Sequence, residues 1–369
     1  MQGERILVTG GAGFIGRAVV RELTARGCRV RVLDSLIDQV HSGQGWPDLE
    51  SDDRVLADIR DADALRAALA GVDRVVHLAA EVGVGQSMYA IERYTSVNDL
   101  GTAVLMEVLS QQPVQRIVTA SSMSIYGEGL YIDVDGAVQE DVVRDGAALA
   151  LGQWDPVDSH GRPLKPLPTP ETKRPNLASV YAIGKYVQEK LTMTVAPAYG
   201  MTASSLRLWN VFGPGQALSN PYTGVLAIFA SRIASGQPPL VFEDGEQLRD
   251  FVHVDDVARA FVLALEGKTE CDGVFNVSSG QPRTVNSVAK ALATAMGSSI
   301  EPELVGKGRV GDIRHCIADV TKSSDVLGFN PKEDFSARLV DLAEWVVTQN
   351  INDRVSEAKN ELELRGLVT

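Results

Sequence analysis

The sequence has few cysteines, a shortage of positive charge and no long apolar run, and each shortage excludes a class of protein. Its 369 residues include only three cysteines, Cys28, Cys271 and Cys316, which lie far apart along the chain. An odd, scattered set of cysteines fits a reducing compartment and predicts neither a disulfide framework nor a zinc knuckle. We therefore expect no metal site.

Positive charge is outnumbered by negative charge. The chain has 35 lysine and arginine residues against 48 aspartate and glutamate residues, a formal net charge of -13. Nothing long-range attracts such a chain to phosphate backbones or anionic membranes, so we expect no nucleic-acid partner and no membrane partner. An anionic ligand must then be bound locally, by individual arginines.

Apolar residues make up 44% of the sequence. They form no run approaching the roughly 18 residues that a membrane span requires. The start MQGERILVTG is too polar for a signal peptide, which predicts a cytoplasmic protein. The length exceeds what one small core needs and predicts two lobes.

The N-terminal residues predict a strand, a turn, a helix and a second strand. The run RILVTG ends in glycine, apolar residues then recur at helical spacing as far as Gly27, and RVRVLD follows. Residues 5–34 therefore form one βαβ unit with a parallel pair of strands.

The turn of this unit fits a dinucleotide-binding motif. Residues 11–16, GAGFIG, satisfy G-x-G-x-x-G between a predicted strand and a predicted helix, which is the context that the motif requires. Bare backbone there lets a pyrophosphate approach the unpaired N–H groups of the helix N-terminus. The alternative is a purely structural turn. The residues assigned to the cofactor site are Gly10, Gly13, Phe14, Ile15 and Gly16.

Asp34, which ends the second strand, indicates which dinucleotide binds. A carboxylate at this place accepts hydrogen bonds from a ribose 2′-OH and repels a 2′-phosphate. The sequence therefore favours NAD over NADP. The alternative is an exposed aspartate that simply ends the strand.

Strands and helices continue to alternate along the chain. Further apolar strands are predicted at 54–59, 73–80, 115–122 and 203–213, with helices between them, such as 61–71 and 98–112. This order predicts an α/β fold with a Rossmann-type, doubly wound parallel sheet, which binds ligands at the carboxyl ends of its strands. The residues at such ends include Asp58, Ala79, Ala80 and Ser122.

The segment SVYAIGKYVQEKL places Tyr181 and Lys185 four positions apart, on one face of a predicted helix. A phenol is a poor base at neutral pH, but a nearby ammonium stabilises the phenolate and lowers the pKa of the tyrosine. Ser122 could share the proton or hold a substrate oxygen. A tyrosine that packs beside a solvated lysine is the alternative. Together with the dinucleotide turn, the pattern favours hydride transfer at a carbinol carbon.

Several segments between residues 8 and 319 resemble the extended short-chain dehydrogenase/reductases that act on nucleotide sugars. They are TGGAGFIG, HLAAEVGVGQS, YTSVNDLGT, ASSMSIYGEG, SVYAIGK, LRLWNVFGPGQ, RDFVHVDDVA and GRVGDIRHCIAD. The resemblance implies that Tyr181 is the base, that Lys185 is its partner and the anchor of the nicotinamide ribose, and that Ser122 is the third catalytic group.

The resemblance also implies further binding residues. Asp58 and Ile59 are expected at the adenine, and those along the rest of the cofactor are Leu78, Ala79, Ala80 and Asn98. The nucleotide diphosphate and sugar are expected to contact Ser122, Asn210, Arg249, Arg309 and Asp312. A planar guanidinium suits diphosphate oxygens. The alternative for each of these two arginines is an ordinary surface ion pair.

The residues after Ser122 bear on the reaction. Family members that are 4,6-dehydratases resemble one another in carrying Thr-Asp-Glu where this sequence has Ser122, Met123 and Ser124. A thioether and a hydroxyl cannot replace that acid and base. The missing Glu also counts against the related decarboxylases, and 3,5-epimerase relatives would carry Cys at position 124. The resemblance then implies 4-epimerisation, with C4 oxidised to a 4-keto sugar and reduced again on its opposite face while NAD stays bound.

Within the family, the chain most resembles enzymes acting on dTDP-6-deoxyhexoses, the dTDP-L-rhamnose 4-epimerases. UDP-hexose or UDP-uronate 4-epimerases, an NAD(P)H-dependent sugar ketoreductase or dehydrogenase and a catalytically silent NAD-binding regulator remain alternatives. Some of the dTDP-L-rhamnose relatives carry paired cysteines where this sequence has PVDSHG at 156–161. His160, without those cysteines, is expected to be a solvated loop residue rather than a metal ligand.

The segment 128–175 lengthens the stretch between Ser122 and Tyr181. It is rich in Pro, Gly and Asp, which predicts a long ordered loop or a lid. Cys316 is expected either to line the sugar pocket or to pack in a core.

The two lobes are predicted to interleave. Residues 1–206 and about 246–270 form the NAD-binding lobe, and about 207–245 and 271–369 form a smaller, mixed α/β lobe for the nucleotide sugar. Helices are expected in this second part at 221–236, 285–297, 336–349 and 353–365. The helices at 98–110 and 180–193 carry apolar residues on more than one face, which, with the resemblance, predicts a homodimer.

Overall fold

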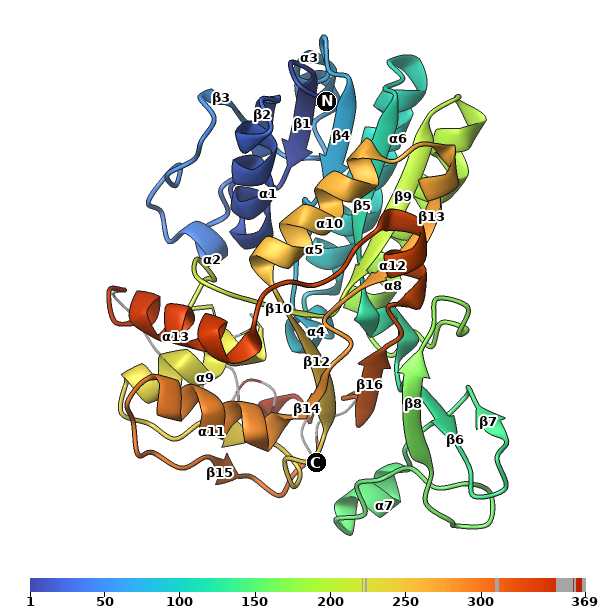
Figure 1. The fold of residues 1–369 in the computed structure, drawn as a ribbon, viewed down its shortest axis with the longest axis vertical. Coiled ribbons are helices and arrows are strands. Elements are labelled where there is room, and N and C mark those ends of the chain that lie inside the picture. The colour runs from blue at the N-terminus through green and yellow to red at the C-terminus, as the bar shows by residue number, and fades with distance from the viewer. Residues whose placement is uncertain (221, 223, 309–311, 350–360, 362, 367–369) are drawn as a thin grey trace.

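Two sheets organise the chain, one in each of two lobes (Figure 1). The computed structural model describes residues 1–220, 222, 224–308, 312–349, 361 and 363–366. The larger sheet lies in the upper lobe of the view and carries helices on both of its faces. The smaller lobe lies below it, at the carboxyl ends of the strands of the larger sheet.

The larger sheet has seven parallel strands in the order β13-β9-β5-β4-β1-β2-β3. The chain builds outward from β1 in both directions, so the predicted doubly wound, Rossmann-type sheet is confirmed. The bounds of its strands are β1 (Arg5–Thr9), β2 (Arg29–Asp34), β3 (Asp53–Leu56), β4 (Arg74–His77), β5 (Arg116–Ser122), β9 (Thr202–Leu208) and β13 (Gly273–Val277).

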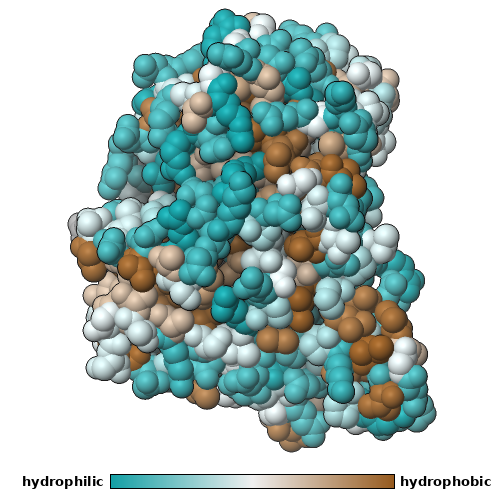
Figure 2. All heavy atoms as spheres, viewed as in Figure 1, coloured by the Kyte–Doolittle hydropathy of each residue, from teal (hydrophilic) through white to brown (hydrophobic). Residues whose placement is uncertain are grey.

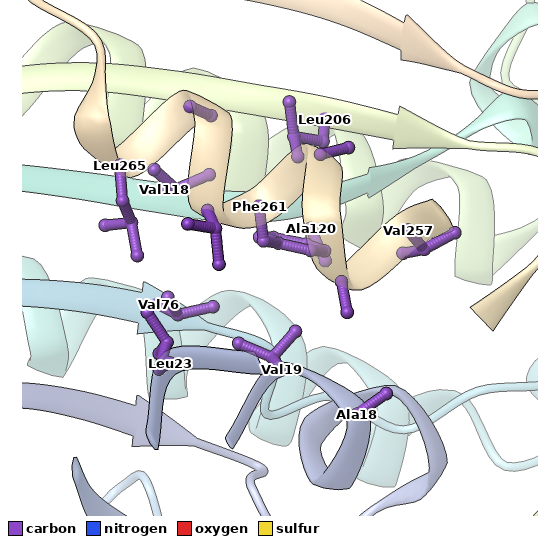
Figure 3. Close-up of a cluster of buried hydrophobic side chains, with 14 of the residues drawn as sticks. Ala18, Val19, Leu23, Val76, Val118, Ala120, Leu206, Val257, Phe261 and Leu265 are labelled. Atoms are coloured by element: carbon purple, nitrogen blue, oxygen red, sulfur yellow. The ribbon is translucent and has the colours of Figure 1, made fainter. Parts of the chain in front are cut away.

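Alternating side chains of β1 enter two different cores, because successive residues of a strand point to opposite faces. Ile6 and Val8 pack under the helices α1 (Phe14–Ala25) and α10 (Val254–Glu266), whereas Leu7 packs on the other side. Figure 3 shows the first of these cores. In it, side chains of the two helices meet apolar residues of β4, β5 and β9. The helices of the other face are α3 (Ala62–Ala68), α6 (Gly101–Gln111) and α8 (Val180–Ala198).

The smaller lobe contains a seven-stranded sheet, in which six strands follow the order β10-β12-β16-β8-β6-β7 and β14 also pairs with β12. Its strands are β6 (Leu130–Ile132), β7 (Val138–Gln139), β8 (Lys165–Thr169), β10 (Asn210–Phe212), β12 (Leu248–His253), β14 (Pro282–Thr284) and β16 (His315–Ala318). Three helices pack together beside it, α9 (Val225–Ala234), α11 (Val285–Ala295) and α13 (Phe335–Val346), at the lower left of Figure 1. These helices confirm three of the four predicted in this part; the fourth, at 353–365, lies mostly outside the described residues.

The strand predicted at 203–213 is wrong as a single element. It divides at Trp209 into β9, in the larger sheet, and β10, in the smaller sheet. The backbone N–H of Trp209 still bonds to the carbonyl of Val277 in the larger sheet, 3.2 Å away. The segment has no glycine or proline before Gly213, so its sequence does not show where the chain passes from one sheet to the next.

The chain also crosses the predicted lobe boundaries in two further places. Strand β13 belongs to the larger sheet, although the predicted division assigns it to the smaller lobe. Strands β6 and β8 belong to the smaller sheet, although the division assigns residues 1–206 to the NAD-binding lobe. As predicted, α10 returns to the larger sheet and packs against α1 (Figure 3).

The remaining elements are short. They are α2 (Asp38–His41), α4 (Val84–Ser87), α5 (Ile91–Thr95), the π-helical turn η1 (Ser96–Leu100), η2 (Met123–Tyr126), α7 (Gly146–Ala150), η3 (Thr269–Cys271), β11 (Leu240–Val241), β15 (Glu303–Leu304) and α12 (Thr321–Leu327). None of the helices in the described residues has both the length and the apolar character that a bilayer span demands.

Candidate active site

Ser122 and Tyr181 meet where β5 ends and α8 begins. The Ser122 hydroxyl hydrogen-bonds to the phenol of Tyr181. The Ser122 Oγ accepts hydrogen bonds from the backbone N–H and the hydroxyl of Ser124, at 3.2 and 3.0 Å, so its own proton is left to donate to the phenol. Burial raises the pKa of Tyr181, and the bond from Ser122 lowers it. The fold thus brings together two of the three residues predicted to be catalytic.

Lys185, one turn along α8, is 4% exposed. Its Nζ donates to the Oε1 of Gln188 at 2.7 Å. Burial lowers the pKa of Lys185 to about 7. A lysine of this kind can gain or lose a proton near neutral pH, as acid–base chemistry requires.

Gln188 connects Lys185 to polar groups of helix α6 and of the segment that follows β4. Its Nε2 donates to the carbonyl of Ala79 at 3.2 Å and to the Oγ1 of Thr102 at 2.9 Å. Thr102 in turn lies 2.9 Å from the Nε2 of His77, whose Nδ1 lies 2.8 Å from the Oγ1 of Thr9. Burial lowers the pKa of His77 to about 3, so the imidazole is neutral.

This buried network was not predicted from the sequence. For Gln188 a signal existed, because a residue three positions after Lys185 lies on the same helix face. For His77 and Thr102 the signal was weak, since a lone buried histidine or threonine in an apolar segment has no distinctive pattern.

The glycine turn has the close backbone contacts that a dinucleotide site needs. A Cβ on Gly10, whose φ is +69°, would lie 2.7 Å from the backbone N of Ala79, and a Cβ on Gly16 would lie 2.4 Å from the carbonyl O of Gly10. Helix α1 begins at Phe14, after Gly13, which has no side chain to cover the helix N–H groups. Exposed N–H groups at the start of a twelve-residue helix can bind a pyrophosphate.

Asp34 is bonded to the same turn. Its Oδ2 accepts from the backbone N–H of Ala12 at 3.0 Å, and its Oδ1 accepts from that of Leu36 at 2.9 Å. The carboxylate therefore holds the turn in place at the end of β2. Its predicted bond to a ribose 2′-OH stays a prediction.

The residues predicted along the rest of the cofactor lie at the same edge of the sheet. Asn98, in the turn η1, donates to the carbonyl of Glu81 at 3.1 Å and accepts from its N–H at 2.8 Å, which fixes the segment after β4. That segment contains Leu78, Ala79 and Ala80. Asp58 accepts from the guanidinium of Arg60 at 2.7 and 2.9 Å, and these bonds lower the pKa of Asp58. Ile59 is buried, and a Cβ on Gly101 would lie 2.5 Å from its Cγ2.

Arg249, predicted at the sugar nucleotide, is bonded to the main chain of the residues before β16. Its Nη1 donates to the carbonyl of Arg314 at 2.9 Å, its Nη2 donates to that of Ile313, and the carboxylate of Asp312 lies 3.7 Å away. With a side chain only 12% exposed, it differs from the surface ion pair that was the alternative. Asn210 donates to the carbonyl of Asp250 at 2.9 Å. Arg309 lies outside the described residues.

Cys316 is fully buried among Met123, Tyr126 and Trp209. Burial raises its pKa to about 12, so the thiol is protonated and behaves as a packing residue. His160 is exposed in the segment 128–175. In the described part of the chain, no three His, Cys, Asp or Glu side chains gather as a metal site would require.

The sequence pattern of the NAD dependent epimerase/dehydratase family matches residues 6–146 and 159–278. This chain is a member of that family. The dTDP-L-rhamnose 4-epimerase of Burkholderia thailandensis is 37% identical over 356 residues, which cover 95% of this chain and 96% of the relative.

Solved structures of epimerases have the same fold. A UDP-N-acetylglucosamine 4-epimerase from Methanobrevibacter ruminantium matches with a TM-score of 0.77 and 28% identity, over 95% of this chain and 100% of that structure. The UDP-glucose 4-epimerase of Thermus thermophilus, solved in complex with NAD, matches with a TM-score of 0.75 and 30% identity, over 94% of this chain and 100% of that structure. The predicted family and cofactor are confirmed: the chain is an enzyme of the NAD dependent epimerase/dehydratase family, and NAD is its cofactor.

Proposed function

We propose that this enzyme is a nucleotide-sugar 4-epimerase, and that its substrate is a dTDP-6-deoxyhexose such as dTDP-L-rhamnose. The observation that carries the proposal is the hydrogen bond between Ser122 and Tyr181, with Lys185 on the same helix face. The glycine turn at Gly10 and Gly16, at the same edge of the sheet, fits a dinucleotide.

The proposed chemistry assigns a proton-transfer role to each of the three residues. When bound, NAD supplies the group that takes up hydride from C4 of the sugar and later returns it. Tyr181 removes the proton of the C4 hydroxyl and gives it back after the sugar has turned over. Ser122 donates its hydrogen bond to the developing phenolate, and the positive charge of Lys185 lowers the pKa of the phenol in the same direction.

The residues after Ser122 support epimerisation rather than elimination of water. The sulfur of Met123 lies 3.6 Å from the Nδ2 of Asn210, and the hydroxyl of Ser124 bonds to Ser122. A thioether cannot carry a proton between substrate atoms, and a hydroxyl already bonded to Ser122 is neither a strong acid nor a strong base. Dehydration would require both.

The choice of sugar nucleotide is supported by the Burkholderia thailandensis relative, a dTDP-L-rhamnose 4-epimerase. The two structural neighbours described above are named as epimerases of UDP sugars. A UDP-hexose or UDP-uronate 4-epimerase is therefore the second candidate. Asn210, Arg249, Arg309 and Asp312 are proposed to surround the nucleotide and sugar in either case.

A homodimer formed through α5, η1 and α8 is part of the proposal. Ile91, Leu100 and Ile183 are large apolar side chains that these elements leave exposed, and such residues are favourable at an interface between subunits. We further propose a cytoplasmic location, in keeping with three free cysteines. Light scattering of the purified protein would show a single-chain mass if the dimer is wrong.

The decisive experiment is incubation with a panel of dTDP-, UDP- and GDP-sugars without added cofactor, followed by NMR of the recovered sugar. Inversion at C4 of a dTDP-6-deoxyhexose is expected, with activity lost in the Tyr181→Phe variant. Loss of water or carbon dioxide would overturn the interpretation of Met123 and Ser124. A stoichiometric change in NAD(P)H absorbance would instead identify a ketoreductase.

A further inference from the structure

The segment 128–175, whose purpose the sequence left open, is built into the smaller lobe at the lower right of Figure 1. Its strand β8 runs parallel to β16, with Ile317 opposite Pro168, and β6 pairs antiparallel with β8. Gly129 donates to the carbonyl of His315 at 2.8 Å, and a Cβ on Gly129 would lie 2.8 Å from the same oxygen. The segment therefore packs directly against the main chain of β16.

Two charged side chains of the segment, Arg144 and Glu128, are buried together with two charged side chains from elsewhere in the smaller lobe, Glu243 and Arg314. Arg144 lies 3.0 Å from Glu128 and 2.5 Å from Glu243. Arg314 lies 3.1 Å from the other oxygen of Glu243 and extends to Asp155, in the segment, at 2.7 Å. Arg144, Glu128, Glu243 and Arg314 have side chains at most 8% exposed. Desolvated charges hold a fixed geometry, because separating them leaves a charge buried and uncompensated. A segment secured in this way is a wall of the lobe rather than a mobile lid.

The outer and inner faces of the segment differ. Figure 2 shows apolar residues gathered over the part of the surface where Figure 1 places β6 to β8. Val134, Val138 and Val157 are exposed apolar residues of this segment. The buried residues Arg144 and Glu128 instead contact Glu243 and the main chain beside β16.

These buried groups hold the main chain of residues 312–315. The Nη2 of Arg144 donates to the carbonyl of Asp312 at 2.6 Å. The carboxylate of Glu128 accepts from the backbone N–H of Arg314 at 2.7 Å and from that of His315 at 3.2 Å. Arg249 donates to the carbonyls of Ile313 and Arg314 in the same stretch. Residues 312–314, which precede β16, are thus bonded both to the segment and, through Arg249, to β12.

We propose that Arg144 and Glu128 are positioning residues for the nucleotide-sugar site, and that the segment 128–175 acts by fixing the loop that carries Asp312. This inference rests on the proposed function, in which Asp312 contacts the substrate. Arg144 bonds in three directions at once, to Glu128, Glu243 and the carbonyl of Asp312, through the planar fork of its guanidinium. A lysine has the same charge but a single nitrogen, which cannot reach all three partners.

The test compares Arg144→Lys with Arg174→Lys, the same chemical change elsewhere in the segment. Arg174 is 69% exposed and pairs with Glu140 and Asp141 at the surface. For Arg144→Lys we expect KM for the nucleotide sugar to rise about tenfold, with kcat and the amount of bound NAD nearly unchanged, because binding is weakened while the reacting groups stay in place. Arg174→Lys should have the same KM, the same kcat and the same amount of bound NAD as the parent protein.

A second measurement does not depend on activity. Hydrogen exchange of the backbone amides of Arg314 and His315 should be slow in the parent protein and faster in Arg144→Lys, but not in Arg174→Lys. Equal exchange and equal KM in the two variants would overturn the inference, as would a loss confined to kcat. If Arg144→Lys does not fold, rapid exchange of these amides in the parent protein would overturn it. A parent protein that epimerises no nucleotide sugar would contradict the proposed function. If exchange at Arg314 and His315 is still slower in it than in Arg144→Lys, that outcome would nevertheless support the fixing of residues 312–315 by Arg144.

Discussion

The Nζ of Lys185 lies 2.7 Å from the Oε1 of Gln188, three residues further along α8. Gln188 in turn bonds through its Nε2 to Thr102 and to the carbonyl of Ala79, so its orientation is fixed. One donor of the ammonium is therefore held toward Gln188. The position of Lys185 thus depends on a residue outside the set predicted to be catalytic.

The first prediction concerns the charge at position 188. In Gln188→Glu, a carboxylate replaces the amide beside the ammonium, which raises the pKa of Lys185 above its present value of about 7. In the proposed mechanism, the same negative charge also offsets the effect of Lys185 on Tyr181, so the pKa of the phenol rises as well. The acidic limb of kcat/KM against pH should move to higher pH by about one unit. Gln112→Glu, an exposed change at the end of α6, is the control, and equal profiles for the two variants would contradict the prediction.

The second prediction concerns the glycine turn. In Gly16→Ala, the new Cβ would lie 2.4 Å from the carbonyl O of Gly10 and 2.6 Å from the Cα of Gly11. Both are backbone atoms and cannot rotate away, so the turn must shift, at a cost of about 1–3 kcal/mol, and lose its fit to a pyrophosphate. NAD released from the denatured protein should fall at least severalfold.

Gly146→Ala is the control for this change. A Cβ on Gly146 meets nothing within 4 Å, and alanine is the better helix former at the start of α7. NAD content should be unchanged and stability equal or up to about 1 kcal/mol higher. Retention of NAD by Gly16→Ala at the level of this control would show that the turn does not bind the cofactor as proposed.

The third prediction concerns a buried ion pair behind the site. Arg207 approaches both oxygens of Glu189, at 2.8 and 3.0 Å, and Ser121 donates to the same carboxylate at 2.8 Å. Glu189→Gln leaves the guanidinium uncompensated, so the free energy of unfolding in urea should fall by about 3–5 kcal/mol. Asp63→Asn removes the charge of a side chain that is 93% exposed, and it should change the free energy of unfolding by less than about 1 kcal/mol. Similar losses in the two variants would contradict this account.

The fourth prediction is a pH dependence of stability. Burial holds the pKa of His77 at about 3, below its ordinary value near ~6.5. As pH falls from the ordinary pKa toward this lowered value, His77 becomes protonated in the unfolded chain but stays neutral in the folded protein. The free energy of unfolding therefore decreases progressively over this pH range. Other buried histidines, such as His315 with its pKa lowered to about 4, act in the same direction.

The contribution of His77 is isolated by the difference between the parent protein and His77→Gln. Between pH 6 and pH 4, one proton corresponds to a slope of about 1.4 kcal/mol per pH unit. The free energy of unfolding should therefore depend less steeply on pH in the variant, by up to that amount. Equal slopes would mean that His77 is protonated in the folded protein.

Local chemistry explains what could be predicted. The strand, turn and helix from Arg5 to Ala25 follow from β-branched residues, glycines and a helical repeat, all within one short stretch of chain. Tyr181 and Lys185 could be paired because the helix alone places them on one face. Ser122 could be added because strand ends meet at one edge of a parallel sheet.

The partners of these residues could not be predicted in the same way. Gln188 lies on α8, Thr102 on the neighbouring helix α6 and His77 on strand β4. Nothing in these separate segments of sequence indicates that the three side chains are in contact. The division of the predicted strand 203–213 at Trp209 is similar, because no glycine or proline separates β9 from β10 and only the sheets themselves distinguish the two strands.

The βαβ start, the glycine turn, the tyrosine and lysine on one helix face and the family can all be inferred from the order of the amino acids, since each depends on residues close together in the chain or on recognisable motifs. The fixed position of the segment 128–175 follows instead from the folded arrangement, because Arg144 and Glu128 contact Glu243 and the main chain of residues 312–315 across long sequence separations. Contacts of this kind depend on how the sheets pack, and their energy comes from burying charges together that each segment alone would leave in water.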